Sequence, residues 1–170
     1  KPGGIVSQWI PLHSQSETHV YQNFRTFYES FPYVMAWYPV RKELILIGSN
    51  QPINLEFQGI EQRLQNPVTN KIMSDIEFSN PFSFLGSIWF LKNELKRMGT
   101  GKRIISDNNP SLEFFLNDPR NISPDKIKKI IENRSSFSDV FEKITQSSYF
   151  FSQAQKVIFK KHWDSRLKAD

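Results

Sequence analysis

The first twelve residues read KPGGIVSQWIPL, a Pro-Gly-Gly turn that leads into an apolar run over residues 5–10. Glycine takes the backbone angles of such a turn at little cost, and the run predicts a buried strand. A turn of this kind feeding an apolar strand is typical of a late position in an α/β sheet. The chemistry of such sheets usually lies at the ends of earlier strands. We therefore expect the chain to hold the late part of a sheet without its catalytic residues.

The next forty residues predict a helix and then two strands. Ser14 and Glu17 have the spacing of a capping box. Four apolar residues then follow at spacings of four, three and four, which places them on one helical face: Val20, Phe24, Phe27 and Phe31. Residues 33–38 and 43–48 read as strands close enough to pair antiparallel. The order strand, helix, strand, strand fits the end of an α/β sheet.

The periodicity turns helical after residue 55. Short helices are predicted over residues 55–65 and 68–77, a longer one over 82–95, and further helical regions from residues 123 and 138. Residues 1–52 are thus expected to hold late strands and a helix of an α/β domain. A helical extension with a return segment at 103–119 follows over residues 53–119, and a C-terminal helical segment occupies residues 120–170.

Composition excludes several classes of function. The chain has no cysteine, which rules out disulfides, a thiolate metal site and a cysteine nucleophile, and favours a reducing compartment such as the cytoplasm. Its net charge of +5 comes from dispersed basic residues, so no nucleic-acid partner is expected. No apolar run is long enough to span a membrane. Three scattered histidines at 13, 19 and 162 predict no metal site.

Several motifs together resemble a known family. They are GGIVSQWIPL at 3–12, FP at 31–32 leading to WYP at 37–39, LILIGS at 44–49 and DNNPSLEF at 107–114. In this order they resemble the late sheet of the polyamine aminopropyltransferases, the spermidine and spermine synthases. Their fold is a Rossmann-like methyltransferase fold, and the bacterial branch associated with membrane segments is the most similar. The resemblance covers residues 1–52 and 103–119, less than half of the chain.

The resemblance implies two substrate-binding residues. Gln8 corresponds to a family glutamine that faces the amine pocket, and Tyr38 to the tyrosine of the family's Tyr-Pro-Ser-Gly turn. An amide and a phenol can both accept hydrogen bonds from an ammonium group. Pairing with the backbone is an equally common role for a glutamine at a strand end, and Tyr38 could act in packing alone. Val40 and Arg41 replace the family's Ser-Gly, and a cationic Arg41 would repel an amine.

The resemblance also implies what the parent protein does. The parent would transfer an aminopropyl group from decarboxylated S-adenosylmethionine to an amine. The family's glycine-rich loop and catalytic aspartate precede the region matched here, so no cofactor site and no catalytic residue are expected in this fragment. Expected partners are the missing N-terminal half of the domain, a polyamine-like small molecule and further copies in a homo-oligomer. Two alternatives stay open: a non-catalytic binding module of a membrane-associated protein, and an S-adenosylmethionine-dependent methyltransferase.

Two further patterns have a structural and a functional interpretation. Asp107 and Glu113 could act as a catalytic carboxylate pair, but Asn109 capping a turn at Pro110, with Asp107 supporting it, is favoured. The C-terminal helix mixes five basic residues with aromatic ones. Such mixing can mark a nucleic-acid or membrane surface. A solvated face opposite an apolar stripe is the favoured interpretation.

Overall fold

The structure is a computed structural model, and it describes residues 3–40, 42–108, 110, 124–145 and 151–168. The chain divides into two compact units, each described here by itself. The sheet unit comprises residues 1–53 and 89–135, and the helical unit comprises residues 54–88 and 136–170. The chain passes between the units three times, so the division differs from the consecutive segments 1–52, 53–119 and 120–170 expected from the sequence.

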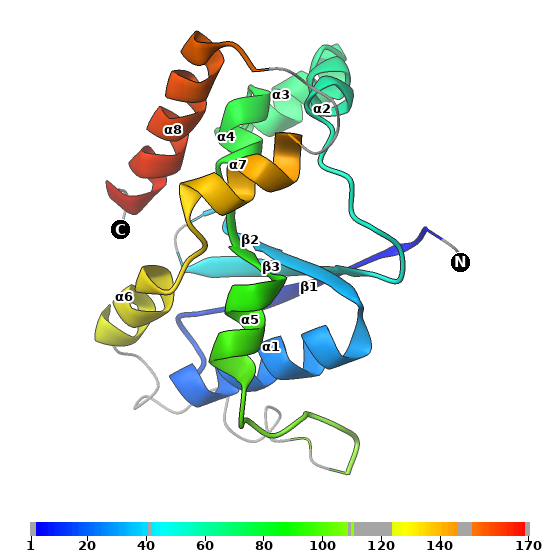
Figure 1. Cartoon of the computed structure of the whole chain (residues 1–170), viewed down its shortest axis with the longest axis vertical. Helices are drawn as coiled ribbons and strands as arrows, with labels where there is room; N and C mark the ends of the chain where they lie inside the picture. The colour runs from blue at the N-terminus through cyan, green and yellow to red at the C-terminus, as the bar shows by residue number, and fades with distance from the viewer. Residues whose placement is uncertain (1–2, 41, 109, 111–123, 146–150, 169–170) are drawn as a thin grey trace. The chain divides into compact units, whose positions relative to one another are not determined.

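The sheet unit has the predicted order of strand, helix, strand and strand. These elements are β1 (Ile5–Pro11), α1 (Glu17–Ser30), β2 (Tyr33–Trp37) and β3 (Glu43–Ser49). β4 (Ile88–Leu91) follows in the sequence where the chain returns from the helical unit, and it lies beside β2 in the sheet. Helices α5 (Lys92–Gly99) and α6 (Pro124–Glu132) complete the unit. The protein is thus an α/β protein, as expected (Figure 1).

The four strands lie in the order β1-β3-β2-β4. β3 pairs antiparallel with β1 on one side and with β2 on the other, which confirms the predicted hairpin of β2 and β3. Because both neighbours run opposite to β3, β1 and β2 run in the same direction, and α1 connects them. In the shared register, Leu46 stands opposite Gln8 of β1 and Ala36 of β2.

Helix α1 covers one face of this sheet. Its residues Val20, Phe24 and Phe27 are buried, as their spacing predicts. A Cβ atom added to Gly48 of β3 would lie 2.6 Å from the ring of Phe31 and 2.7 Å from that of Phe27. Glycine is therefore required at residue 48 for the helix to approach the strand this closely. Helix α5 also packs against α1, where a Cβ atom added to Gly99 would lie 2.9 Å from the backbone nitrogen of Arg25.

The helical unit contains five helices among the described residues. They are α2 (Phe57–Leu64), α3 (Pro67–Asp75), α4 (Pro81–Leu85), α7 (Phe137–Thr145) and α8 (Gln153–Lys168). Aromatic side chains form its core: the ring of Phe57 lies 5.0 Å from that of Phe82 and 5.1 Å from that of Phe151. The two short helices predicted over 55–65 and 68–77 are confirmed within a few residues.

Three details of the sequence prediction are wrong. The capping residue of α1 is Ser16, whose hydroxyl accepts from the His19 amide, whereas Ser14 donates to the carbonyl of Pro11. The helix predicted over 82–95 is α4, a strand and α5, because residues 88–90 are apolar in succession and all are buried in β4. The first strand is not buried, because β1 lies at an edge of the sheet and, among the described strands, pairs only with β3.

Candidate functional site

Gln8 lies exposed in the middle of the edge strand β1. Across the sheet it stands opposite Leu46, which is buried beneath α1. Its neighbours in the strand are also accessible, since Ile5 is 64% exposed and Trp9 is 62% exposed. Glu43 of β3 accepts a hydrogen bond from the indole of Trp9 and lies 3.3 Å from His13. The amide of Gln8 is thus accessible to a ligand or to a neighbouring polypeptide.

Tyr38 lies in a different environment, buried directly after β2. Its ring stacks on that of Trp89, with the centroids 3.9 Å apart and the planes 11° from parallel. Its hydroxyl accepts a hydrogen bond of 2.8 Å from the amide of Lys42, whose backbone is left-handed at φ 65°. These contacts fix the turn between β2 and β3. They give Tyr38 a packing role that the sequence pattern alone left open.

The two predicted binding residues are not on adjacent strands, because β3 runs between β1 and β2. Strands in a sheet are spaced about 4.8 Å apart, so two strand spacings separate the backbones by about 10 Å. Gln8 is exposed, whereas Tyr38 is only 3% exposed and its hydroxyl accepts from the Lys42 amide. The structure therefore leaves their shared role as a prediction.

Trp89 is a residue that the sequence reasoning missed. It is fully buried and stacks on the ring of Tyr38. The guanidinium of Arg134 lies 5.6 Å from the centroid of the Trp89 ring. The carbonyl of Trp89 accepts from the amide of Ser135, and the hydroxyl of Ser135 hydrogen-bonds to the carboxylate of Glu94. Nothing in the sequence links residues this far apart, and no local pattern could have identified the cluster.

Asp107 and Glu113 have a second, less favoured interpretation as a catalytic carboxylate pair. Glu113 lies outside the described residues. Asn109 and Arg41 also lie outside them. Asp107 is exposed and follows a segment anchored to α1, where the amide of Ile105 donates to the hydroxyl of Thr26. Among the described residues, no three histidine, aspartate or glutamate side chains gather as a metal site would require. Within the same residues, no helix is long and apolar enough to cross a membrane.

Two titratable side chains of α1, those of Tyr21 and His19, have shifted pKa values. Burial raises the pKa of the Tyr21 phenol, and the neighbouring carboxylate of Glu17 raises it further by its charge and its hydrogen bond. Glu17 also forms an ion pair of 2.9 Å with Lys129 of α6, which ties that helix to α1. Burial lowers the pKa of His19 on the same helix. Of these groups, Glu17 joins α1 to α6 through its ion pair with Lys129.

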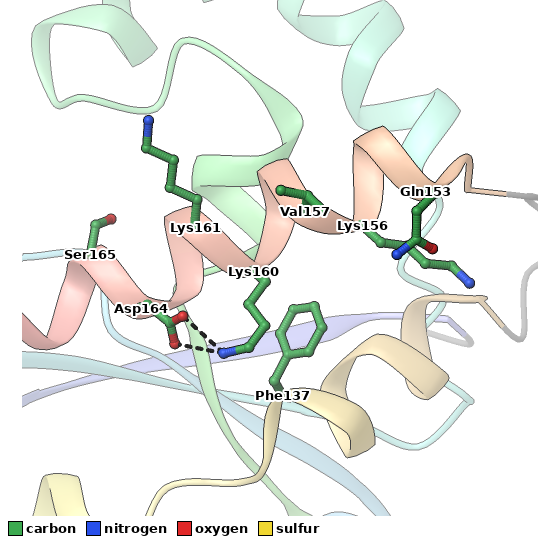
Figure 2. A pocket seen from close by; sticks show the side chains of 8 residues that line it. All are labelled: Phe137, Gln153, Lys156, Val157, Lys160, Lys161, Asp164 and Ser165. Carbon is green, nitrogen blue, oxygen red and sulfur yellow. Dashed lines mark hydrogen bonds and ion pairs between the residues drawn. The ribbon is translucent and has the colours of Figure 1, made fainter.

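A second accessible site lies in the helical unit, along the outer face of α8 (Figure 2). We call it the α8 groove; its volume is about 650 Å³. It is lined by Phe137, Gln153, Lys156, Val157, Lys160, Lys161, Asp164 and Ser165. The opposite face of α8 is buried through Phe159 and Trp163. The basic face is exposed, as expected, but the apolar stripe is buried only in part, because Ile158 is 44% exposed. The structure adds that the basic face is hollowed.

Comparison of the chain with protein-family models, with curated proteins and with solved structures found no match. Two accessible features of the described residues are candidate sites: the edge of β1 with Gln8, and the α8 groove.

Proposed function

We propose that the sheet unit is the C-terminal end of a methyltransferase-type sheet in a spermidine-synthase-like protein. The parent reaction would be aminopropyl transfer from decarboxylated S-adenosylmethionine to an amine. The arrangement of β1, β3 and β2 carries this proposal. Two strands run in the same direction, a helix connects them, and the last strand lies antiparallel between them. This order is compatible with the late part of an α/β sheet, to which β4 adds a strand beside β2. The motifs at 3–12 and 44–49 resemble the late sheet of that family.

The free edge of β1 supports the same proposal. β1 has the apolar sequence of an interior strand, yet Ile5, Val6 and Trp9 are 64%, 45% and 62% exposed. An edge strand with unpaired backbone groups readily accepts another strand. In the proposed protein, earlier parallel strands pair with this edge and carry the nucleoside-binding loop and the catalytic aspartate. Ligands of open α/β sheets bind at the carboxyl ends of such strands.

Within this proposal the residues of the chain bind the acceptor and do not carry out the chemistry. The exposed Gln8 amide would accept a hydrogen bond from an ammonium group of the amine. Tyr38 would hold the turn after β2 through its hydrogen bond to Lys42. Positioning of the acceptor amine against the donor would then account for much of the rate.

The test asks whether the coding region extends upstream and compares this chain with any longer polypeptide that it encodes. Sequencing the coding region upstream of Lys1 should reveal a glycine-rich turn after one strand and an aspartate at the end of a later strand. The longer polypeptide should then bind a thioadenosine nucleoside in calorimetry and transfer the aminopropyl group, while the 170-residue chain alone should do neither. Use of S-adenosylmethionine itself as donor would instead identify a methyltransferase.

A non-catalytic binding module is the second candidate function. The buried stack of Tyr38 on Trp89 favours it, because these contacts give Tyr38 a packing role without a ligand. Absence of the glycine-rich turn and of the aspartate from the upstream coding region would support this candidate and exclude aminopropyl transfer.

A further inference from the structure

The α8 groove combines an apolar wall with a positively charged rim. Its residues recur along α8 at spacings of three and four, which places Lys156, Val157, Lys160 and Lys161 on one helical face. Val157 is 60% exposed, and the ring of Phe137 from the start of α7 lies beside Lys160 at one side of the groove (Figure 2). An apolar side chain entering the groove would therefore contact Val157 and Phe137.

The three lysines of the groove are held differently. Lys160 forms an ion pair of 2.8 Å with Asp164 and lies 5.6 Å above the ring of Phe137. Lys156 lies 5.5 Å above the ring of Phe141 and makes no ion pair with any described residue. Lys161 likewise has no carboxylate partner in the described part of the chain. Three lysines against one aspartate leave an excess of two positive charges at the groove.

We infer that the α8 groove binds an acidic amphipathic helix of a partner protein. Lys156 and Lys161 are five residues apart on α8, a rise of about 7.5 Å. Carboxylates four or five residues apart on a partner helix span a similar distance and would meet both ammonium groups. An apolar residue between them would enter the groove beside Val157. Apolar anchors flanked by complementary charges are the usual means by which a groove recognises a helix.

The charges and ring contacts favour this occupant over three others. A second copy of the chain would bring the same positive excess to the groove and would be repelled. A nucleic acid would need a free aromatic face, but the ring of Phe137 packs against Phe141, Phe159 and Trp163. An anionic membrane would meet the carboxylate of Asp164 on the same face as the lysines. The inference does not depend on aminopropyl transfer.

The test uses the whole chain and a synthetic helix. The probe is a fluorescently labelled peptide of roughly 16 residues, since shorter isolated helices are marginal in water. In this peptide, leucines form one face of the helix, and glutamates four residues apart lie on either side of the leucines. We expect binding that weakens as salt is added, because the charges at the rim are exposed. Reversing both free charges, with Lys156→Glu and Lys161→Glu, should weaken binding by about tenfold or more.

Matched controls separate this site from general attraction between opposite charges. Lys71→Glu makes, elsewhere in the helical unit, the same change of two charge units as either single reversal, Lys156→Glu or Lys161→Glu, and should leave binding within about twofold. A peptide with glutamine in place of glutamate should bind at least tenfold more weakly. Equal weakening by the Lys71→Glu variant would overturn the inference. So would undiminished binding after reversal of Lys156 and Lys161, or binding of phosphatidylserine vesicles without binding of the peptide.

Discussion

β1 and β3 are both seven-residue strands of mainly apolar sequence, and they pair with each other along their whole length. β3 has a strand on either side and α1 on one face, and Leu44 and Leu46 are fully buried. β1 has one neighbour in the described part of the chain, and only its last part, at Ile10, reaches the core. The difference shows that an apolar strand becomes a core strand through its neighbours. The sequence of β1 is thus suited to a larger sheet than the described strands provide.

The largest expected effect comes from removing the side chain of Leu46 in β3. Leu46→Ala should lower the free energy of unfolding by about 2–5 kcal/mol, because it leaves a cavity beneath α1. Gln8→Ala, at the position directly opposite in β1, should change it by less than about 0.5 kcal/mol. Urea unfolding of both variants checks the comparison. Equal destabilisation by the two changes would show that β1 is as well packed as β3.

A smaller effect is expected at Gly48, where β3 meets α1. Gly48→Ala should destabilise the chain by about 1–3 kcal/mol, because the added methyl group forces the rings of Phe27 and Phe31 to shift. Val6 pairs with Gly48 but is 45% exposed, so Val6→Ala should have the smaller effect. Thermal unfolding followed by circular dichroism gives both values. A neutral Gly48→Ala would mean that α1 is not held closely against β3.

The edge of β1 should affect self-association more than stability. The 170-residue chain should associate at high concentration through its unpaired edge, and Trp9→Lys should suppress this, since charged side chains on edge strands oppose pairing. The change in unfolding free energy should stay within about 0.5 kcal/mol, because Trp9 is exposed. Sedimentation velocity measures the association. A wild-type chain that stays monomeric at high concentration would contradict the role assigned to this edge.

Titration tests the helix that covers β3. The pKa of Tyr21 is raised in the folded state, so the unfolded state loses its phenolic proton first as pH rises. Its contribution is therefore complete below the ordinary pKa of 10.0 and decreases above it. Tyr21→Phe should flatten the loss of stability above pH 10 in urea unfolding. The lowered pKa of His19 acts in the opposite direction, with stability lost as pH falls below 6.5.

The smallest expected effect is at the surface of the helical unit. Lys160 and Asp164 form an exposed ion pair one turn apart on α8. Lys160→Ala should lower the free energy of unfolding by about 0.3–0.5 kcal/mol, because such pairs contribute little in water. Urea unfolding at low and high salt checks it. A loss of several kcal/mol would show that Lys160 packs on Phe137 as part of the core.

Local patterns in the sequence predicted much of the fold. The spacing of Val20, Phe24 and Phe27 marks the buried face of α1, and the turn between residues 38 and 43 marks the hairpin of β2 and β3. β4 was missed because its apolar residues also fit helical spacing, and only its pairing with β2 decides between the two structures. The exposure of β1 was missed because it depends on neighbours along the sheet, which a local pattern does not report.

The candidate sites depend still more on distant contacts. Gln8 and Tyr38 were identified through a family resemblance, and the structure adds the exposure of the first and the burial of the second. Tyr38, directly after β2, stacks on Trp89 of β4. No periodicity in the sequence connects these two residues. The basic face of α8 was visible as lysines mixed with aromatic residues. Its groove depends on Phe137, which is contributed by a different helix.

The most direct test of the central claim is amide hydrogen exchange measured along β1. In the 170-residue chain, the amides of β1 should exchange markedly faster than those of β3, because one edge of β1 is open. In the longer polypeptide that the proposed function requires, added parallel strands should slow exchange in β1 to the level of β3. If β1 is as protected as β3 in the 170-residue chain, or gains no protection in the longer polypeptide, β1 is not the edge on which a larger sheet is built.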